Sequence, residues 1–359
     1  MFYWLFYKIL YPEISFFRVF KYITVRAGCS ALFSLVFVLV FTPFFINYLK
    51  QKGFYEKVKA KYLENHLPKE AIPTMGGIAI LSGIILSTLL WARLDNRLIA
   101  LILLATMGFG LFGLLDDYLK LIKERPLMIR EKLLGQIGIG FLIGLYLFLY
   151  PLSITGLSID IPFTKDISLN LGIFYILFCI FVIVACSNSV NLTDGLDGLA
   201  IGSCIFVCFG LIGMSYVAGN VKLAGYLKID YVPQGGELVV YLSSLLGASL
   251  GFLWYNSYPA TIFMGDTGSL ALGGVLGTTA LAIKQEIPFI ILGGLFVLEA
   301  GSVLIQIISF KVFGKKVFLI APLHHHFEKR GWQESKIVIR FWIIAIIFVL
   351  LSFATLKIR

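Results

Sequence analysis

Uninterrupted apolar stretches of about twenty residues dominate this chain and limit what it can fold into. As a helix, each is long enough to cross a hydrocarbon core about 30 Å thick. Of the 359 residues, 59% are hydrophobic and 14% are charged, which is outside the usual range of soluble domains. We expect ten spans, over about 28–49, 75–94, 97–115, 133–151, 171–190, 198–217, 238–255, 267–284, 287–310 and 336–356.

The N-terminal segment 1–20 is also apolar and aromatic, but Tyr11-Pro12-Glu13 interrupts it and no small-residue cleavage site follows. We interpret it as an interfacial helix and not as a signal peptide. The sequence therefore predicts an all-α, polytopic membrane protein. Residues 1–359 would form a single integral-membrane domain with about ten transmembrane helices.

The net charge of +10 is concentrated in three loops, at about 50–74, 116–132 and 311–335. With ten spans these loops fall on one face of the membrane, and their excess of lysine and arginine predicts that this face is cytoplasmic. Both termini would then lie on the opposite, periplasmic side. A basic inner face suits anionic headgroups and anionic substrates, and nucleic acid is not an expected partner.

The unusual polar residues gather in those three loops and in two more on the same face, at about 191–197 and 256–266. This predicts one reactive site at the membrane boundary, whereas a transporter more typically places polar groups near the bilayer midplane. Glu299 is an exception, because it lies in the middle of a span. It is either functional or bonded to a serine or threonine of a neighbouring helix.

Asp116 and Asp117 close an apolar run and open a basic loop. Adjacent carboxylates repel one another unless a cation lies between them. The pair therefore suggests a divalent metal that handles phosphate at the membrane surface, and the plainer alternative is a solvated helix end. Lys120 would lie one turn from Asp116, as a simple ion-pair partner or as a clamp for phosphate.

Residues 191–198 contain two Asp-Gly units three residues apart. Such a turn would direct two carboxylates the same way. Asn188, Asn191 and Asp194 are hard to explain as helix caps and point to a ligand site. Asp197 is equally well explained as the cap of the next helix.

The loop at about 256–266 ends with Asp266, which opens a helix. The plainer interpretation of Asp266 is that it caps this helix. Gly265 and Gly268 permit close approach of a ligand to the backbone. Phe263 is either a ring that stacks on a base or part of the core.

Three consecutive histidines, 324–326, cannot all face one metal from a helix, so contact with a diphosphate is a better interpretation than a zinc site. In the first loop, the pair Gly76-Gly77 at a helix start predicts exposed backbone N–H groups, which form an anion site. Lys69 would add a positive charge there.

Five of these motifs, in this order, resemble those of the polyprenyl-phosphate N-acetylhexosamine-1-phosphate transferases over essentially the whole chain. They are Pro-Thr-Met-Gly-Gly at 73–77, Asp-Asp-Tyr at 116–118, Asn-Leu-Thr-Asp-Gly-Leu-Asp-Gly at 191–198, Met-Gly-Asp at 264–266 and Pro-Leu-His-His-His at 322–326. The histidine run is the most specific, because it resembles the muramoyl-pentapeptide branch and not its cousins.

The resemblance implies a multi-pass enzyme of the bacterial cytoplasmic (inner) membrane. Enzymes of this branch transfer phospho-MurNAc-pentapeptide from UDP-MurNAc-pentapeptide to undecaprenyl phosphate. They form lipid I and UMP with Mg²⁺, or with Mn²⁺ in its place, in the first membrane step of peptidoglycan synthesis. The expected partners are these substrates and membrane lipids. Whether the chain forms a homodimer stays open. The alternatives are a sibling transferase that uses another UDP-HexNAc, and a secondary transporter or flippase, for which only Glu299 argues.

When the motifs are matched residue by residue, the resemblance implies that Asp266 is a metal ligand. It also implies that Asp116 is the group proposed as base toward the lipid phosphate and that Asp117 is the partner of Asp116. We expect all three to be catalytic and to hold the metal. From the motifs and the resemblance together, the expected substrate-binding residues are Lys69, Thr74, Lys120, Lys132, Asn188, Asn191, Asp194, Asp197, Asn256, Phe263, Gly265, Gln306, His324, His325 and His326.

Overall fold

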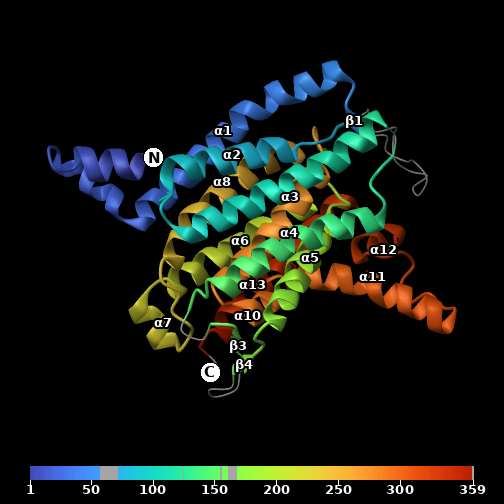
Figure 1. Ribbon diagram of the computed structural model, residues 1–359. Coiled ribbons are helices and arrows are strands. Elements are labelled where there is room, and N and C mark those ends of the chain that lie inside the picture. The colour runs from blue at the N-terminus through green and yellow to red at the C-terminus, as the bar shows by residue number, and fades with distance from the viewer. Residues whose placement is uncertain (57–71, 124, 154–155, 161–167, 358–359) are drawn as a thin grey trace.

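The computed structural model describes residues 1–56, 72–123, 125–153, 156–160 and 168–357. Long helices run side by side in one bundle, which confirms the predicted all-α membrane fold (Figure 1). The helices are α1 (Ile23–Lys52), α2 (Gly77–Trp91), α3 (Arg97–Ile122), α4 (Ile129–Leu149), α5 (Phe174–Thr193), α6 (Leu199–Ala218), α7 (Val221–Leu227), α8 (Leu238–Asn256), α9 (Gly265–Ala282), α10 (Glu286–Leu292), α11 (Gly294–Phe313), α12 (Leu323–Lys329) and α13 (Glu334–Thr355). Two small antiparallel sheets pair β1 (Tyr55–Glu56) with β2 (Ile72–Pro73) and β3 (Ser158–Asp160) with β4 (Ser168–Asn170).

Eight helices in the described part of the chain are long and apolar enough to cross a membrane: α1, α3, α4, α5, α6, α8, α11 and α13. They correspond to eight of the ten predicted spans. The other two are α2, which has only 15 residues, and α9. Helix α9 is rich in glycine and threonine and is buried from Asp266 to Ala282, because other helices surround it on every side.

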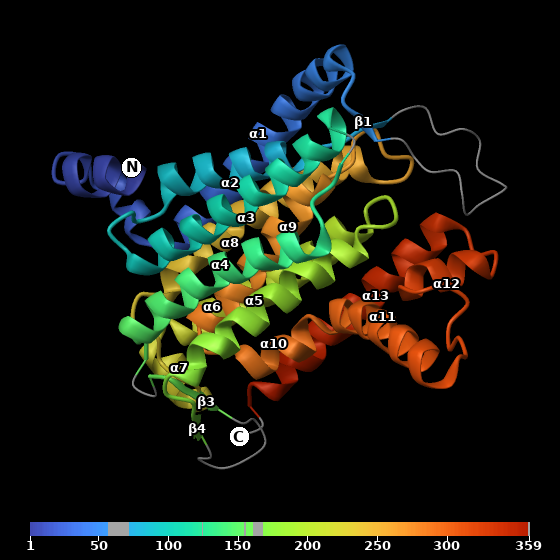
Figure 2. The ribbon, with the colours of Figure 1, turned by 45° about the vertical axis from the view of Figure 1, so that its right-hand side comes forward.

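The predicted span at 287–310 is divided in the structure, because two helices, α10 and α11, occupy this region and meet at Gly293, and only α11 is long and apolar enough to cross a membrane. Gly293 has φ −85° and ψ 18°, which lies outside helical geometry. A Cβ on the next residue, Gly294, would collide with the ring of Phe348 on α13. The chain turns where it meets α13, and the far end of α11 projects from the bundle beside α12 (Figure 2).

The N-terminal segment forms two short helices, η1 (Tyr3–Leu10) and η2 (Ser15–Lys21), on either side of the predicted break. Rings of Phe2 and Phe20 pack on Trp91 at the end of α2, with centroid distances of 4.9 and 6.0 Å. The segment is thus helical, but as two short helices and not one. Its place in a membrane interface stays a prediction.

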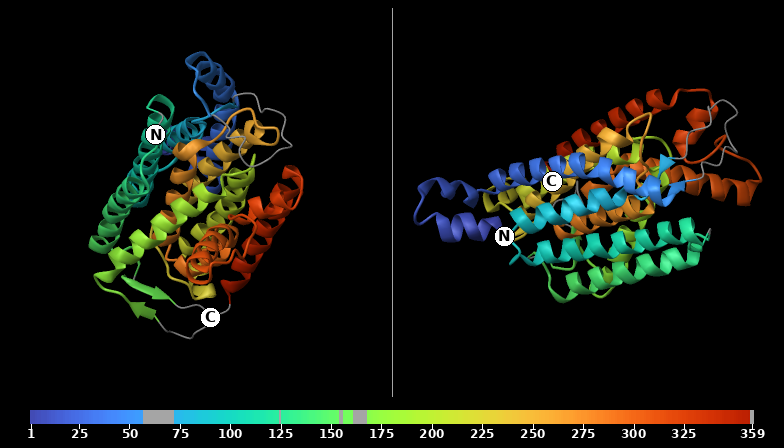
Figure 3. Two further views of the ribbon diagram at one scale, coloured as in Figure 1. Left: turned by 90° about the vertical axis from the view of Figure 1, so that its right-hand side faces the viewer. Right: turned by 90° about the horizontal axis from the view of Figure 1, so that it is seen from above.

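Helices α8 and α9 lie at the centre of the bundle, where α8 packs on α1, α2 and α6, and α9 packs on α3 and α5. The described parts of the five polar loops gather at one end, and both termini and the β3–β4 sheet lie toward the other (Figures 2 and 3). The structure therefore brings the predicted polar loops together at one end. Which side of the membrane that end faces stays a prediction.

Candidate active site

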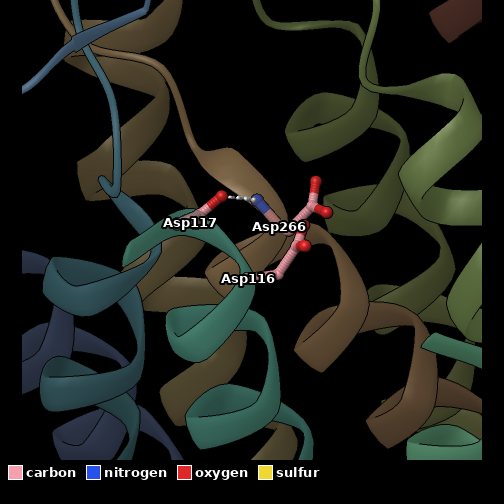
Figure 4. Close-up of side chains that lie close together, drawn as sticks. All are labelled: Asp116, Asp117 and Asp266. Atoms are coloured by element: carbon pink, nitrogen blue, oxygen red, sulfur yellow. Dashed lines mark hydrogen bonds between the residues drawn. The ribbon is translucent and has the colours of Figure 1, made fainter. Parts of the chain in front are cut away.

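Three buried carboxylates meet where the end of α3 touches the start of α9 (Figure 4). One oxygen each of Asp116, Asp117 and Asp266 lies within 4.8 Å of the others. Gly113 makes the approach possible, because a Cβ there would collide with the carbonyl of Asp266. Within the described residues, this is the one group that brings three potential metal-ligand side chains together.

Two lysines occupy the same space as Asp116 and Asp266. The Lys120 ammonium lies 2.9 Å from Oδ2 of Asp116 and 2.9 Å from Oδ2 of Asp266. Lys132, from the start of α4, lies 2.8 and 2.5 Å from the same two oxygens. Two positive charges thus face three carboxylates, and both lysines keep partial exposure, 36% and 23%. Small shifts of these flexible side chains would let them meet an incoming phosphate.

Asp117 faces the backbone at the start of α9, where Figure 4 shows its hydrogen bond to Asp266. Its carboxylate accepts the N–H of Asp266 at 3.0 Å, the N–H of Thr267 at 2.8 Å and the Thr267 hydroxyl at 2.7 Å. The nearest lysine, Lys120, is 3.8 Å from its Oδ1. Asp116 and Asp117 thus share Lys120, but the closest partners of Asp117 belong to α9.

The end of α5 carries two amides, of which Asn191 bonds to the cluster and Asn188 bonds to Gln136 of α4. Asn191 donates to Oδ1 of Asp266 at 3.0 Å and to the Ser269 hydroxyl at 2.8 Å. Asn188 donates to the Gln136 side chain at 2.5 Å and accepts from it at 3.4 Å. The prediction that Asn188 and Asn191 lie at the site is consistent with this placement, and Asp194 follows at the C-terminal end of α5.

Asp197 and Asn256 hold two loops together in this structure. Oδ2 of Asp197 accepts the N–H of Ala260 at 3.0 Å. Asn256 accepts the N–H of Gly198 at 3.2 Å and donates to the carbonyl of Ile262 at 2.9 Å. The N-cap position of α6 is Gly198, one residue after Asp197, and the capping interpretation of Asp197 stays a prediction.

The glycine pair of the first loop does not offer free N–H groups, so the predicted anion site there is wrong. Gly76 donates to the carbonyl of Phe263 at 2.9 Å, and Gly77 donates to that of Met264 at 2.8 Å. A Cβ on Gly77 would collide with the backbone of α9, so close packing explains these glycines. Thr74 is buried beside them, whereas Lys69 lies outside the described residues.

Phe263 and Gly265 flank the start of α9. The backbone N–H of Phe263 donates to the carbonyl of Pro73 at 2.8 Å, and its side chain is partly exposed. Gly265 has φ +74°, a conformation that glycine adopts far more readily than other residues. The phenyl ring of Phe263 keeps partial exposure next to the start of α9.

The three histidines of α12 point to three different partners. Nδ1 of His324 lies 2.9 Å from Oε2 of Glu299, and the backbone N–H of His324 donates to Oε1 of the same carboxylate at 3.3 Å. His325 pairs with Glu328 at 2.9 Å. This spread agrees with the expectation that the run is not a zinc site. The Glu299 carboxylate thus bonds to His324 of α12, while the Ser302 hydroxyl of its own helix donates to the Glu299 backbone carbonyl at 2.7 Å.

His324 also reaches the 191–198 loop. Its Nε2 is buried, and no described residue bonds to it. A Cβ on Gly195 would collide with this nitrogen, so the absence of a side chain at Gly195 lets the ring enter. The His324 side chain thus connects Glu299 in the bundle to the loop that carries Asn191 and Asp194.

His326 and Gln306 organise the chain before α12. Nδ1 of His326 accepts the N–H of Leu319 at 3.1 Å. Burial and the charge of Arg330 lower the pKa of His326, which suits a neutral ring with an accepting nitrogen. Gln306 donates to the carbonyl of Phe318 at 2.9 Å and accepts its N–H at 2.9 Å.

Four polar residues that the sequence did not single out bond to predicted site residues in the structure. Gln136 holds Asn188, Thr267 holds Asp117, Ser269 holds Asn191, and Glu334 accepts the N–H of Asp197 at 2.8 Å. Gln136 had a visible signal, because it is a polar residue in an apolar span one turn after Lys132. The other three are small or lie at helix starts, where such residues are common.

Comparison with known proteins places this chain among membrane transferases. The family model for glycosyl transferase family 4 matches residues 99–284, about half of the chain. A phospho-N-acetylmuramoyl-pentapeptide-transferase from Desulfotalea psychrophila is 48% identical over 361 aligned positions, which cover 99% of this chain and 100% of the relative. A protein of the same name from Citrifermentans bemidjiense is 47% identical and covers 98% and 99% of the two chains.

Proposed function

The chain belongs to the phospho-N-acetylmuramoyl-pentapeptide-transferases of glycosyl transferase family 4, and from this membership we propose its reaction. It transfers phospho-MurNAc-pentapeptide from UDP-MurNAc-pentapeptide to undecaprenyl phosphate and produces lipid I and UMP. The observation that supports this most directly is the meeting of Asp116, Asp266, Lys120 and Lys132 at the loop end of a membrane bundle.

The chemistry needs two anions to approach each other. A phosphate oxygen of the lipid attacks the phosphorus next to the sugar, one phosphorus–oxygen bond forms, and the bond to UMP breaks. The Lys120 and Lys132 ammonium groups would contact phosphate oxygens and reduce this repulsion. Asp116 is the proposed acceptor for a proton of the lipid phosphate, and its Oδ1 is oriented by the Leu127 N–H at 2.8 Å.

Mg²⁺, with Mn²⁺ able to take its place, is the proposed cofactor. The donor set fits, because the carboxylates of this group, whose oxygens lie within 4.8 Å of one another, include the hard ligands that these ions prefer. Asp266 and Asp116 would hold the ion. A bound divalent cation would supply neutralisation of the diphosphate.

We also propose that the site faces the cytoplasm, in the inner membrane of a bacterium. The support is the excess of lysine and arginine in three of the loops at this end. Labelling of a cysteine introduced at position 325 from outside intact cells would contradict this orientation.

The test is release of UMP by purified protein supplied with UDP-MurNAc-pentapeptide and undecaprenyl phosphate. We expect turnover that EDTA stops, that Mg²⁺ or Mn²⁺ restores and that a zinc-specific chelator leaves intact. Asp266→Asn serves as the matched inactive control. Turnover only with UDP-GlcNAc would identify a sibling transferase, and no UMP with either donor would overturn the proposal.

A further inference from the structure

Helix α9 begins without a capping side chain of its own. The residue at its N-cap is Met264, whose side chain makes no hydrogen bond to the first turn. The first N–H groups of a helix have no acceptor within the helix, so they need one from elsewhere. Here the acceptor is Asp117, which lies 149 positions earlier in the chain and accepts from Asp266 and Thr267.

The fit between α3 and α9 leaves little room for any other arrangement. Asp117 is 3% exposed and Thr267 is 1% exposed. A Cβ on Gly265 would lie 2.6 Å from Oδ2 of Asp117. The three hydrogen bonds to α9 and the close approach of Gly265 together hold Asp117 in this place.

We propose that Asp117 is a positioning residue, with Thr267 as its partner, and that it is not a ligand of the metal. Its Oδ2 accepts the N–H and the hydroxyl of Thr267, and its Oδ1 accepts the N–H of Asp266. By fixing the backbone of Asp266, it directs that side chain to Lys120 and Lys132. This inference rests on the proposed function and deepens it, because it leaves Asp116 and Asp266 as the carboxylates that face the phosphates and the cation.

The first measurement is hydrogen exchange of the segment 264–270 in the detergent-solubilised full chain, and it does not depend on activity. We expect at least about tenfold faster exchange in Thr267→Val and in Asp117→Asn. Asp116→Asn should leave this segment unchanged. Thr279→Val is the matched control, because it also removes a buried hydroxyl from α9, one that bonds to the Val275 carbonyl at 2.8 Å.

The second measurement separates positioning from ligation. We expect Thr267→Val to lower kcat about tenfold with an unchanged KM for the UDP-sugar, and Thr267→Ser to restore kcat. The double variant Asp117→Asn/Thr267→Val should be no slower than Asp117→Asn alone, since both changes remove the same contact. Mn²⁺ binding, followed by electron paramagnetic resonance, should persist in Asp117→Asn and disappear in Asp266→Asn.

Two outcomes would overturn the assignment. One is loss of Mn²⁺ binding in Asp117→Asn without faster exchange over 264–270, which would make Asp117 a ligand. The other is unchanged exchange in Thr267→Val. Neither depends on which sugar nucleotide is the substrate, so failure of the proposed reaction would be recognised separately.

Discussion

Two groups of buried charges lie at opposite ends of this bundle, and they are built differently. Away from the loops, Arg26 and Glu237 are 2% and 5% exposed and form a bidentate pair of one cation and one anion. Glu237 also accepts the backbone N–H of Arg93 at 2.8 Å. At the loop end, two partly exposed lysines face three carboxylates, so the cluster keeps an excess negative charge and access to solvent.

The difference separates a structural pair from a cluster that can change partners. A guanidinium fork holds a carboxylate in one geometry, whereas a lysine ammonium is a point charge on a flexible stem. Removing one member of a balanced buried pair leaves an uncompensated charge. Removing one carboxylate from the loop-end cluster leaves two positive and two negative charges. The two ends should therefore respond to neutralisation in opposite ways.

The largest expected effect is on stability, at the balanced pair. Glu237→Gln should lower the free energy of unfolding by about 3–5 kcal/mol, because Arg26 stays buried without a counter-charge. Turnover per folded molecule should be retained. Thermal unfolding in detergent, combined with UMP release, measures both, and replacing Arg26 and Glu237 together by methionine should recover much of the stability. Loss of turnover without loss of stability would break the comparison.

At the loop end the same kind of change should affect turnover. We expect Asp116→Asn and Asp266→Asn each to lower UMP release at least about 100-fold, a barrier increase of about 2.7 kcal/mol. The unfolding temperature should stay equal or rise, since each change balances the charges. If either variant turned over at the parent rate, that aspartate would leave the catalytic set.

A next smaller effect is expected at Phe263, which lies beside the cluster without a charge. Stacking of a base on an aromatic ring contributes about 1–3 kcal/mol in nucleic-acid sites, so Phe263→Ala should raise the KM for the UDP-sugar about tenfold to a hundredfold. The KM for undecaprenyl phosphate should change little, because that substrate has no base. An unchanged nucleotide KM with a lower unfolding temperature would show that the ring is core packing.

Much of the fold was predictable because hydropathy is a local property of the sequence. The apolar runs predicted the helices, and the turn-rich polar segments predicted which loops would gather. The break at Gly293 was not predictable in this way, since glycines 293 and 294 also fit a continuous span. At Gly294 a side chain would collide with the Phe348 ring on α13, which lies more than fifty positions later in the chain, so this contact could not be read locally.

The candidate site was predictable as a set of residues but not as a set of contacts. Asp116, Asp117 and Asp266 were identified by type and position, and they do converge. Nothing local distinguishes Asp116 from Asp117, because the difference depends on the backbone of α9. For the same reason, the sequence does not show that the carbonyls of residues 263 and 264 accept the N–H groups of Gly76 and Gly77.

A moderate effect is expected from Glu299, the charge between the two ends. Glu299→Gln keeps a hydrogen bond but places an N–H against Nδ1 of His324, so the proton must move to Nε2, which faces Gly195. We expect UMP release to fall about tenfold, as for other residues that orient a histidine. Metal binding and the unfolding temperature should be preserved. Parent-like turnover would mean that the orientation of His324 is not used in the reaction.

The smallest expected effect sharpens the comparison at the end of the bundle that lies away from the loops. Arg93 and Asp95 form an ion pair with a distance of 2.7 Å, close to those of the buried groups, but both side chains are 43% exposed. The hydrogen bond and charge of Arg93 lower the pKa of Asp95, so any stabilisation is present above the ordinary carboxyl pKa and is lost as the pH falls below it. Asp95→Asn should change the free energy of unfolding by less than about 1 kcal/mol at pH 7, and salt should reduce this difference further. Thermal unfolding at low and high ionic strength measures it beside Glu237→Gln. A loss as large as that of Glu237→Gln would show that the distance between charges, and not their burial, determines what a pair contributes in this protein.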